Sequence, residues 1–76
     1  MRITDLVPGE TYVVVQPFRD ARGTLALEGD DQTFERIAFG PTGVFEVVFR
    51  QETLYLHAED QADVTEHTER FLRLAD

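Results

Sequence analysis

Turn-forming residues divide this chain into short runs, and their spacing limits the possible folds more than any other feature of the sequence. They gather at residues 8–9, 20–23, 28–31 and 40–43, where proline, glycine and acidic residues interrupt the apolar runs. Proline fixes the backbone, glycine tolerates left-handed conformations and aspartate bonds to nearby amides, so such segments end regular structure. The sequence therefore predicts short antiparallel strands joined by tight turns.

Five runs outside these turns are rich in β-branched and aromatic residues, which favour strands. In the last two runs the side chains alternate between the two sides of a sheet. We assign to the core side Phe45, Val47, Phe49, Leu54 and Leu56, and to the outer side Val44, Glu46, Val48, Thr53, Tyr55 and His57. The predicted strands are residues 11–18, 24–27, 32–39, 44–49 and 53–57.

Two of the predicted strands contain an irregularity. Pro17 has no amide hydrogen to donate, so the first strand must end or bulge there, or turn that side to solvent. Phe34 and Ile37 are three residues apart, which places them on opposite faces of a regular strand. We therefore expect a β-bulge near Glu35 and Arg36, because one extra residue returns both apolar side chains to the same face.

The period of the apolar residues changes near the C-terminus, where the sequence predicts an amphipathic helix over residues 63–75. Apolar side chains form one stripe at helical spacing and charged side chains lie opposite. Asp63 is placed to cap the first turn, and Glu66 three residues later completes a capping box. The stripe consists of Val64, Thr68, Phe71, Leu72, Leu74 and Ala75.

Short strands with one closing helix predict a mainly β fold of the α+β class. Five strands are too few for a normal sandwich, and they bury their inner faces best by curling into a small barrel. We expect a single domain over residues 1–76, built as a five-stranded SH3-like barrel with the helix covering it. The alternative is a strongly curled antiparallel sheet with the helix packed across one face.

Two resemblances accompany this prediction. The run Leu27-x-Gly29-Asp30-x-x-x-Phe34 looks like the entry to the second strand of SH3-like domains. Over most of its length the chain resembles a group of short uncharacterised bacterial domains. That group has no assigned activity, so the resemblance implies none. The shared residues are Phe18-x-Asp20-x-x-Gly23, Gly29-Asp30 followed by Phe34, Phe39-x-Pro41-x-Gly43, and Gln61.

Composition excludes several classes of function. The chain has no Cys, Ser, Lys, Asn or Trp, which removes thiol and serine nucleophiles, Schiff-base lysines and the P-loop lysine. Fifteen acidic residues against seven arginines give a net charge of −8, which repels nucleic acid and anionic membranes. We expect a cytoplasmic protein, since no targeting segment is evident. Because the residue types named above are missing, we also expect that the protein is not an enzyme and needs no cofactor.

Few side chains are left that could bind a ligand by specific chemistry. His57 and His67 flank a group of acidic residues, but their spacing fits no metal motif, so we expect no metal site. Arg19, Arg22 and Arg36 are able to bind a phosphate or carboxylate through two hydrogen bonds. In so acidic a chain, we expect them to pair with its own carboxylates instead.

Apolar residues on outer strand faces provide the strongest indication of function. They are covered either by the C-terminal helix or by a partner, which is another protein or a second copy of the chain. The leading hypothesis is a non-catalytic protein-binding module. An acidic stoichiometric inhibitor, such as a toxin-immunity protein or a DNA mimic, is the alternative, and a metal- or small-ligand-binding domain is the second alternative. The candidate surface residues are Tyr12, Phe18, Val44, Val48 and Tyr55.

Overall fold

The computed structural model describes residues 1–75 and contains seven strands with three short helical segments. The strands are β1 (Thr11–Val14), β2 (Phe18–Arg19), β3 (Leu25–Ala26), β4 (Asp31–Phe39), β5 (Val44–Phe49), β6 (Thr53–His57) and β7 (Leu72–Leu74). The helical segments are the 3-10 turns η1 (Ile3–Asp5) and η2 (Thr68–Arg70) and the α-helix α1 (Ala62–Glu66).

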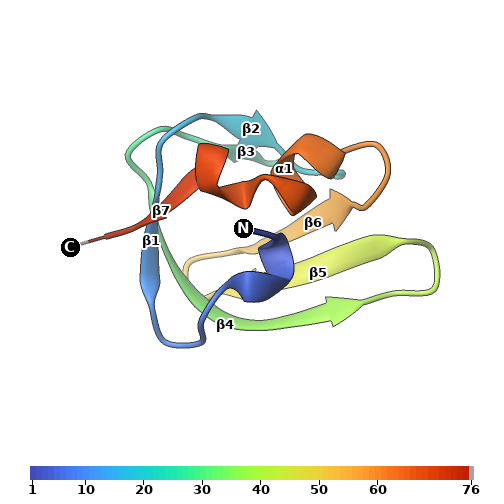
Figure 1. Ribbon diagram of the computed structural model, residues 1–76, viewed down its shortest axis with the longest axis horizontal. Coiled ribbons are helices and arrows are strands. Elements are labelled where there is room, and N and C mark those ends of the chain that lie inside the picture. Colours follow the sequence, from blue (N-terminus) through green and yellow to red (C-terminus); the bar gives the residue numbers. More distant parts are fainter. Residues whose placement is uncertain (76) are drawn as a thin grey trace.

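The strands form two antiparallel sheets. A five-stranded sheet has the order β6-β5-β4-β1-β7, and β2 pairs with β3 in a separate two-stranded sheet. Figure 1 shows β4 bending, so that β1 crosses the direction of β5 and β6. The predicted mainly β class is confirmed, but the count of five strands is wrong. The sheet also stays open, since β6 and β7 lie at its two edges, so the predicted closed barrel does not form.

The two predicted irregularities have clear outcomes. The register of β4 against β5 shifts between Phe34 and Arg36, which confirms the bulge at Glu35. A bulge bends its strand and increases the local twist, and here it lies within the strand that bends. The first strand already ends at Val14, before Pro17, because the chain leaves the large sheet there to form β2.

The core lies against the inner face of β4, β5 and β6. Val47, Phe49, Leu54 and Leu56 are buried, as the alternation predicted, and Phe45 packs half-buried beside them. Aromatic rings add edge-to-face contacts, with centroids 6.0 Å apart for Phe34 and Phe49 and 5.5 Å apart for Phe18 and Phe71. The core thus joins both sheets and the C-terminal segment. It is completed by Ile3, Leu6, Tyr12, Val14, Ala26, Val64 and Leu72.

The predicted helix over residues 63–75 is wrong beyond its first turn. The α-helix ends at Glu66, and the remaining residues form η2 and then β7. Strand β7 pairs with β1, with Val13 opposite Arg73, and two flanking bonds run from Val15 N–H to Phe71 C=O and from Ala75 N–H to Thr11 C=O. Helix propensity is a weak preference, and pairing with the otherwise open edge of β1 overrides it.

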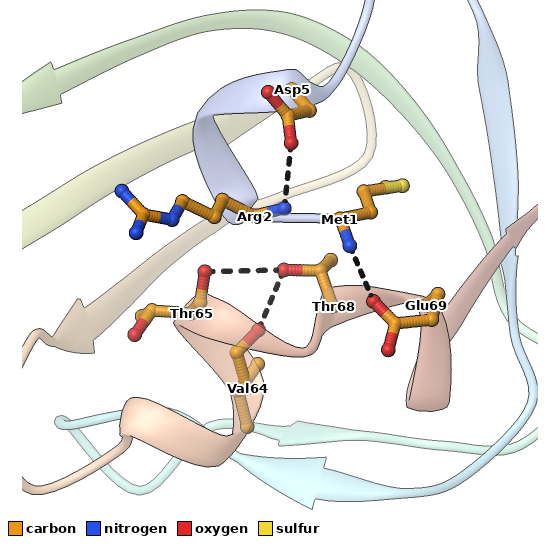
Figure 2. A network of polar contacts seen from close by, with 7 residues as sticks. All are labelled: Met1, Arg2, Asp5, Val64, Thr65, Thr68 and Glu69. Carbon is orange, nitrogen blue, oxygen red and sulfur yellow. Dashed lines mark hydrogen bonds and ion pairs between the residues drawn. The ribbon is translucent and has the colours of Figure 1, made fainter.

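A network around Thr68 shows where the helix stops (Figure 2). The Thr68 amide donates to the carbonyl of Met1 at 2.9 Å, so it is not used to continue the helix. The Thr68 hydroxyl donates instead to the Val64 carbonyl at 2.6 Å, and the Met1 ammonium donates to the Glu69 carboxylate at 2.7 Å. The N-terminal segment therefore holds the C-terminal turns in place.

None of the helices between residues 1 and 75 combines the length and apolar character needed to cross a bilayer.

Replacing the buried Thr68 with valine tests this helix stop. Thr68→Val keeps the side-chain shape but removes the hydroxyl that bonds the Val64 carbonyl. We expect the free energy of unfolding to fall by about 1–2 kcal/mol, measured by urea denaturation. The control is Thr4→Val at an exposed position, which should change stability by less than about 0.5 kcal/mol. Equal losses in the two variants would contradict a special role for Thr68.

The ion pair at Glu69 predicts a pH-dependent contribution to stability. The hydrogen bond from the Met1 ammonium lowers the pKa of the Glu69 carboxyl, and a backbone hydrogen bond lowers it to a smaller extent. A carboxyl with a lowered folded-state pKa stabilises the fold above its unfolded pKa, and loses this effect as pH falls through the folded pKa. We therefore expect Glu69→Gln to be less stable than the wild type at neutral pH, with the difference vanishing as the solution is acidified below about pH 4.

Urea denaturation of both proteins across this pH range measures the difference. The matched control is Glu66→Gln, which removes a neighbouring exposed carboxylate that makes no ion pair within residues 1–75. A Glu69→Gln difference that stays constant down to strongly acidic pH would contradict the proposed ion-pair contribution.

Candidate functional site

The outer face of β4, β5 and β6 is the side that points away from the core. Directly opposed residues of antiparallel strands share a face. Val44 opposes His57, Glu46 opposes Tyr55 and Val48 opposes Thr53, alternating with the pairs that line the core. On β4, Arg36 and Ala38 belong to the same face, because they oppose Val48 and Glu46. The predicted outward orientation of Val44, Val48 and Tyr55 is therefore confirmed.

A concave surface of about 410 Å³ lies on part of this face, and we call it the outer hollow. Its apolar part comes from the sheet, and its rim comes from the β2–β3 loop and from the β4–β5 turn. Its volume lies in the range typical of ligand pockets, but it is open to solvent rather than enclosed. The lining residues are Ala21, Arg22, Ala38, Phe39, Gly40, Thr42, Val44, Glu46 and Tyr55.

The buried carboxylate of Asp20 fixes the loop that forms one rim of the outer hollow. It accepts hydrogen bonds from the amides of Arg22 at 2.9 Å, Thr24 at 2.8 Å and Tyr55 at 2.9 Å. The amide of Ala21 donates in turn to the Tyr55 carbonyl at 2.6 Å. Both backbone groups of Tyr55 on the open edge of β6 are thereby bonded to the loop, which holds the loop against the sheet.

Gln61 closes the same edge of β6 two residues further along. Its side-chain oxygen accepts from the His57 amide at 3.0 Å, and its side-chain nitrogen donates to the Arg19 carbonyl at 2.5 Å. The Gln61 amide also donates to the His57 carbonyl at 2.9 Å. Strand β6 is therefore protected from pairing with an added strand, which unprotected edges allow. Asp20 and Gln61, both part of the resemblance to short bacterial domains, have a structural role here.

Arg22 and Glu46 are the charged residues that line the outer hollow. The guanidinium of Arg22 lies 4.8 Å from the ring centre of Tyr55, a cation–π contact. Arg36 lies 3.3 Å from the carboxylate of Glu46. Arg36 lies beside the hollow and pairs with Glu46, so Arg22 is the unpaired charge of the lining, whereas the whole chain carries −8.

The structure separates the five predicted surface residues into three groups. Val44 and Tyr55 line the outer hollow, and Val48 lies on the outer face beyond it. Tyr12 and Phe18 are core residues, 3% and 8% exposed, so the prediction that they lie on a binding surface is wrong. The bend of the sheet turns Tyr12 inward, and its hydroxyl accepts from the Val7 amide at 2.9 Å.

The predicted cover of the outer face by the C-terminal helix does not form. Val64 of α1 and Phe71 belong to the core cluster, so this segment packs on the inner side of the sheet. Val44, Val48 and Tyr55 instead remain half-buried.

Sequence reasoning missed the pairing of Arg22 with Tyr55. The sequence indicates Arg22 only as a possible anion ligand, and local patterns cannot show its contact with Tyr55 because the two residues lie far apart along the chain. The available signal was Asp20-x-x-Gly23, a turn that positions Arg22 at its tip. Gly23 has φ of +86°, a left-handed conformation that the turn requires and that glycine adopts readily.

The two histidines lie outside the outer hollow. The Nδ1 atom of His57 accepts the amides of Glu59 and Asp60, each at 3.3 Å, and His67 follows α1 at an exposed position. In the part of the chain that the structure describes, no three His, Asp or Glu side chains gather in an arrangement suited to a metal ion.

Comparison with known proteins shows the fold alone. No protein-family model matches the sequence, and no curated protein matches it significantly. Among solved structures, the chain is similar to an integron cassette protein from the mobile metagenome of Vibrio cholerae. The TM-score is 0.87 with 22% sequence identity, over 92% of this chain and 88% of that chain. The likeness agrees with the expected resemblance to short bacterial domains and does not establish an SH3-like barrel.

Replacing Asp20 with asparagine tests the anchor of the rim. The carboxylate of Asp20 accepts hydrogen bonds on both oxygens, whereas an asparagine amide has only one acceptor oxygen. Its NH₂ group would face a backbone N–H, and the hydrogen bond at that position would be lost. We expect Asp20→Asn to lower the free energy of unfolding by about 2–3 kcal/mol, measured in urea. The control Asp31→Asn removes a carboxylate from an exposed position and should stay within about 0.5 kcal/mol of wild type. If Asp20→Asn leaves the free energy of unfolding nearly unchanged, the hydrogen bonds of Asp20 are not what holds the loop against β6.

Proposed function

We propose that this protein is a non-catalytic protein-binding module that contacts its partner through the outer hollow. The observation that supports this most is a half-buried apolar surface formed by Val44 and Tyr55 beside a loop fixed by Asp20. A surface that is already shaped loses little conformational entropy on binding, which favours affinity. Small SH3-like domains use aromatic-lined surfaces in this way, and we propose a comparable use here.

The residues that line the outer hollow are better suited to bind a protein than to catalyse a reaction. Val44, Tyr55 and Ala38 offer aliphatic and aromatic contacts, and Arg22 adds a residue type enriched at interfaces. Phe39, which is 61% exposed, also lines the hollow at the end of β4, where its ring packs against that of Phe45. Contiguous exposed apolar area of this kind marks interaction surfaces in soluble domains.

An acidic stoichiometric inhibitor is the competing proposal, and the charge of −8 supports it. Exposed carboxylates at Glu59, Asp60, Asp63 and Glu66 follow one another along the β6–α1 segment. Such a surface would bind a basic enzyme by long-range attraction, which salt screens. The two proposals therefore differ in the surface used and in the effect of ionic strength.

Affinity capture with matched variants tests the proposed function. The immobilised chain is exposed to a bacterial lysate, and bound proteins are quantified by mass spectrometry. We expect Val44→Glu to reduce the specific partner by about tenfold or more, because it places a charge in the apolar floor. Leu27→Glu is the matched control, since it adds the same charge at a residue that is 52% exposed and lies outside the hollow.

The same capture at low and high ionic strength separates the two proposals. Binding through the outer hollow should survive high salt and should be lost in Val44→Glu. A partner that is released by salt but retained equally by Val44→Glu and by wild type would overturn the proposal in favour of the acidic inhibitor.

A further inference from the structure

Arg22 is the arginine that lines the outer hollow. Ion pairs hold Arg36 to Glu46 and Arg50 to Glu35, but from Met1 to Ala75 no carboxylate lies within ion-pair distance of the Arg22 guanidinium. Arg22 lies at the rim of the outer hollow instead, stacked over the ring of Tyr55. A positive charge that no carboxylate of residues 1–75 pairs with therefore lies at the edge of an apolar surface.

The stacked position leaves the hydrogen-bonding groups of Arg22 available. A guanidinium over an aromatic ring uses its face for the contact, while its five N–H donors point outward in its plane. That fork matches the two oxygens of a carboxylate, which Arg binds through parallel hydrogen bonds. The Asp20 bonds to the amides of Arg22 and Tyr55 hold the two backbone segments side by side, and the cation–π contact places the guanidinium beside the ring.

The short distance between Arg22 and Tyr55 limits the chemical structure of a ligand that contacts both residues. With the guanidinium 4.8 Å from the ring centre, the anion and the apolar group of the ligand must be close neighbours. In an extended peptide, successive side chains point to opposite sides, so an acidic residue beside an apolar one directs its carboxylate away. A C-terminal residue carries its carboxylate and its side chain on the same carbon.

The closed edge of β6 also favours a chain end over a passing strand. The backbone groups of Tyr55 and His57 are bonded to Asp20, Ala21 and Gln61, so a peptide cannot extend the sheet there. A terminal residue needs no such pairing. The unpaired charge of Arg22 suits an anion, because Glu46 is paired with Arg36 and charges elsewhere on the surface are screened beyond about 8 Å at physiological salt.

We propose that the outer hollow binds the C-terminal residue of a partner protein, with its apolar side chain on Val44 and Tyr55 and its α-carboxylate on Arg22. This inference rests on the proposed function and specifies the partner chemistry. Arg22 sets the specificity for a free chain end, and the apolar floor sets the preference for an aromatic or branched side chain.

Titration of the full chain followed by amide NMR tests the proposal. The probes are N-acetyl-phenylalanine, its neutral amide, and an N-acetylated Phe-Asp dipeptide with an amidated C-terminus. We expect shifts at Val44, Tyr55 and Arg22 with the free acid, and binding about tenfold weaker for the other two probes. Arg22→Gln should abolish the preference for the acid while leaving weak binding of the amide.

Arg50→Gln is the matched control, because it removes an arginine that does not line the hollow. Amide dispersion and the thermal midpoint establish that each variant is folded. Equal binding of the acid and the amide would overturn carboxylate recognition, and equal binding of the Phe-Asp dipeptide would overturn the choice of a chain end. Absence of any shift in the hollow would also overturn the inference. The proposed function is tested separately, by loss of the captured partner in Val44→Glu.

Discussion

The buried carboxylate of Asp20 is the interaction on which the rest of the structure depends most directly. It joins the β2–β3 loop to β6, and so connects the small sheet to the edge of the large one. A buried carboxylate is stable only when its oxygens are hydrogen-bonded, and here three backbone amides meet that need. The same bonds close the edge at Tyr55 and bring Arg22 over its ring. The Asp20 side chain thus closes the edge of β6 at Tyr55 and holds the β2–β3 loop in the position where it forms the rim of the candidate site.

The C-terminal segment shows how the fold settles competing local preferences. Residues 63–75 have the apolar stripe of a helix, yet the Thr68 amide bonds to Met1 and residues 72–74 pair with β1. Each of these contacts satisfies backbone groups that would otherwise stay open at the end of the chain or at a sheet edge. Most of the predicted apolar stripe is buried in the observed arrangement, since Val64, Thr68, Phe71 and Leu72 belong to the interior while Leu74 is exposed.

The candidate site does not share the strong negative charge of the molecule, because Arg22 and Glu46 are the charged residues of its lining while the chain carries −8. The net negative charge creates a field around the whole molecule, while the outer hollow places Arg22 beside the apolar side chains of Val44 and Tyr55. These two properties work at different ranges, because the general field acts over many ångströms and the guanidinium fork acts only on contact. The proposed recognition of a short feature of a partner depends on the contact-range group, Arg22, and not on the general field.

Local sequence determined β5 and β6, whose bounds and inner faces follow from alternation at Phe45 to Phe49 and at Leu54 and Leu56. It also determined the bulge at Glu35, because Phe34 and Ile37 must share the core. Only the tertiary structure decided that Tyr12 and Phe18 face inward, that residues 72–74 form a strand, and that Arg22 meets Tyr55. Alternation and turn chemistry act between near neighbours, whereas these three outcomes depend on which distant segments pair across the curved sheet.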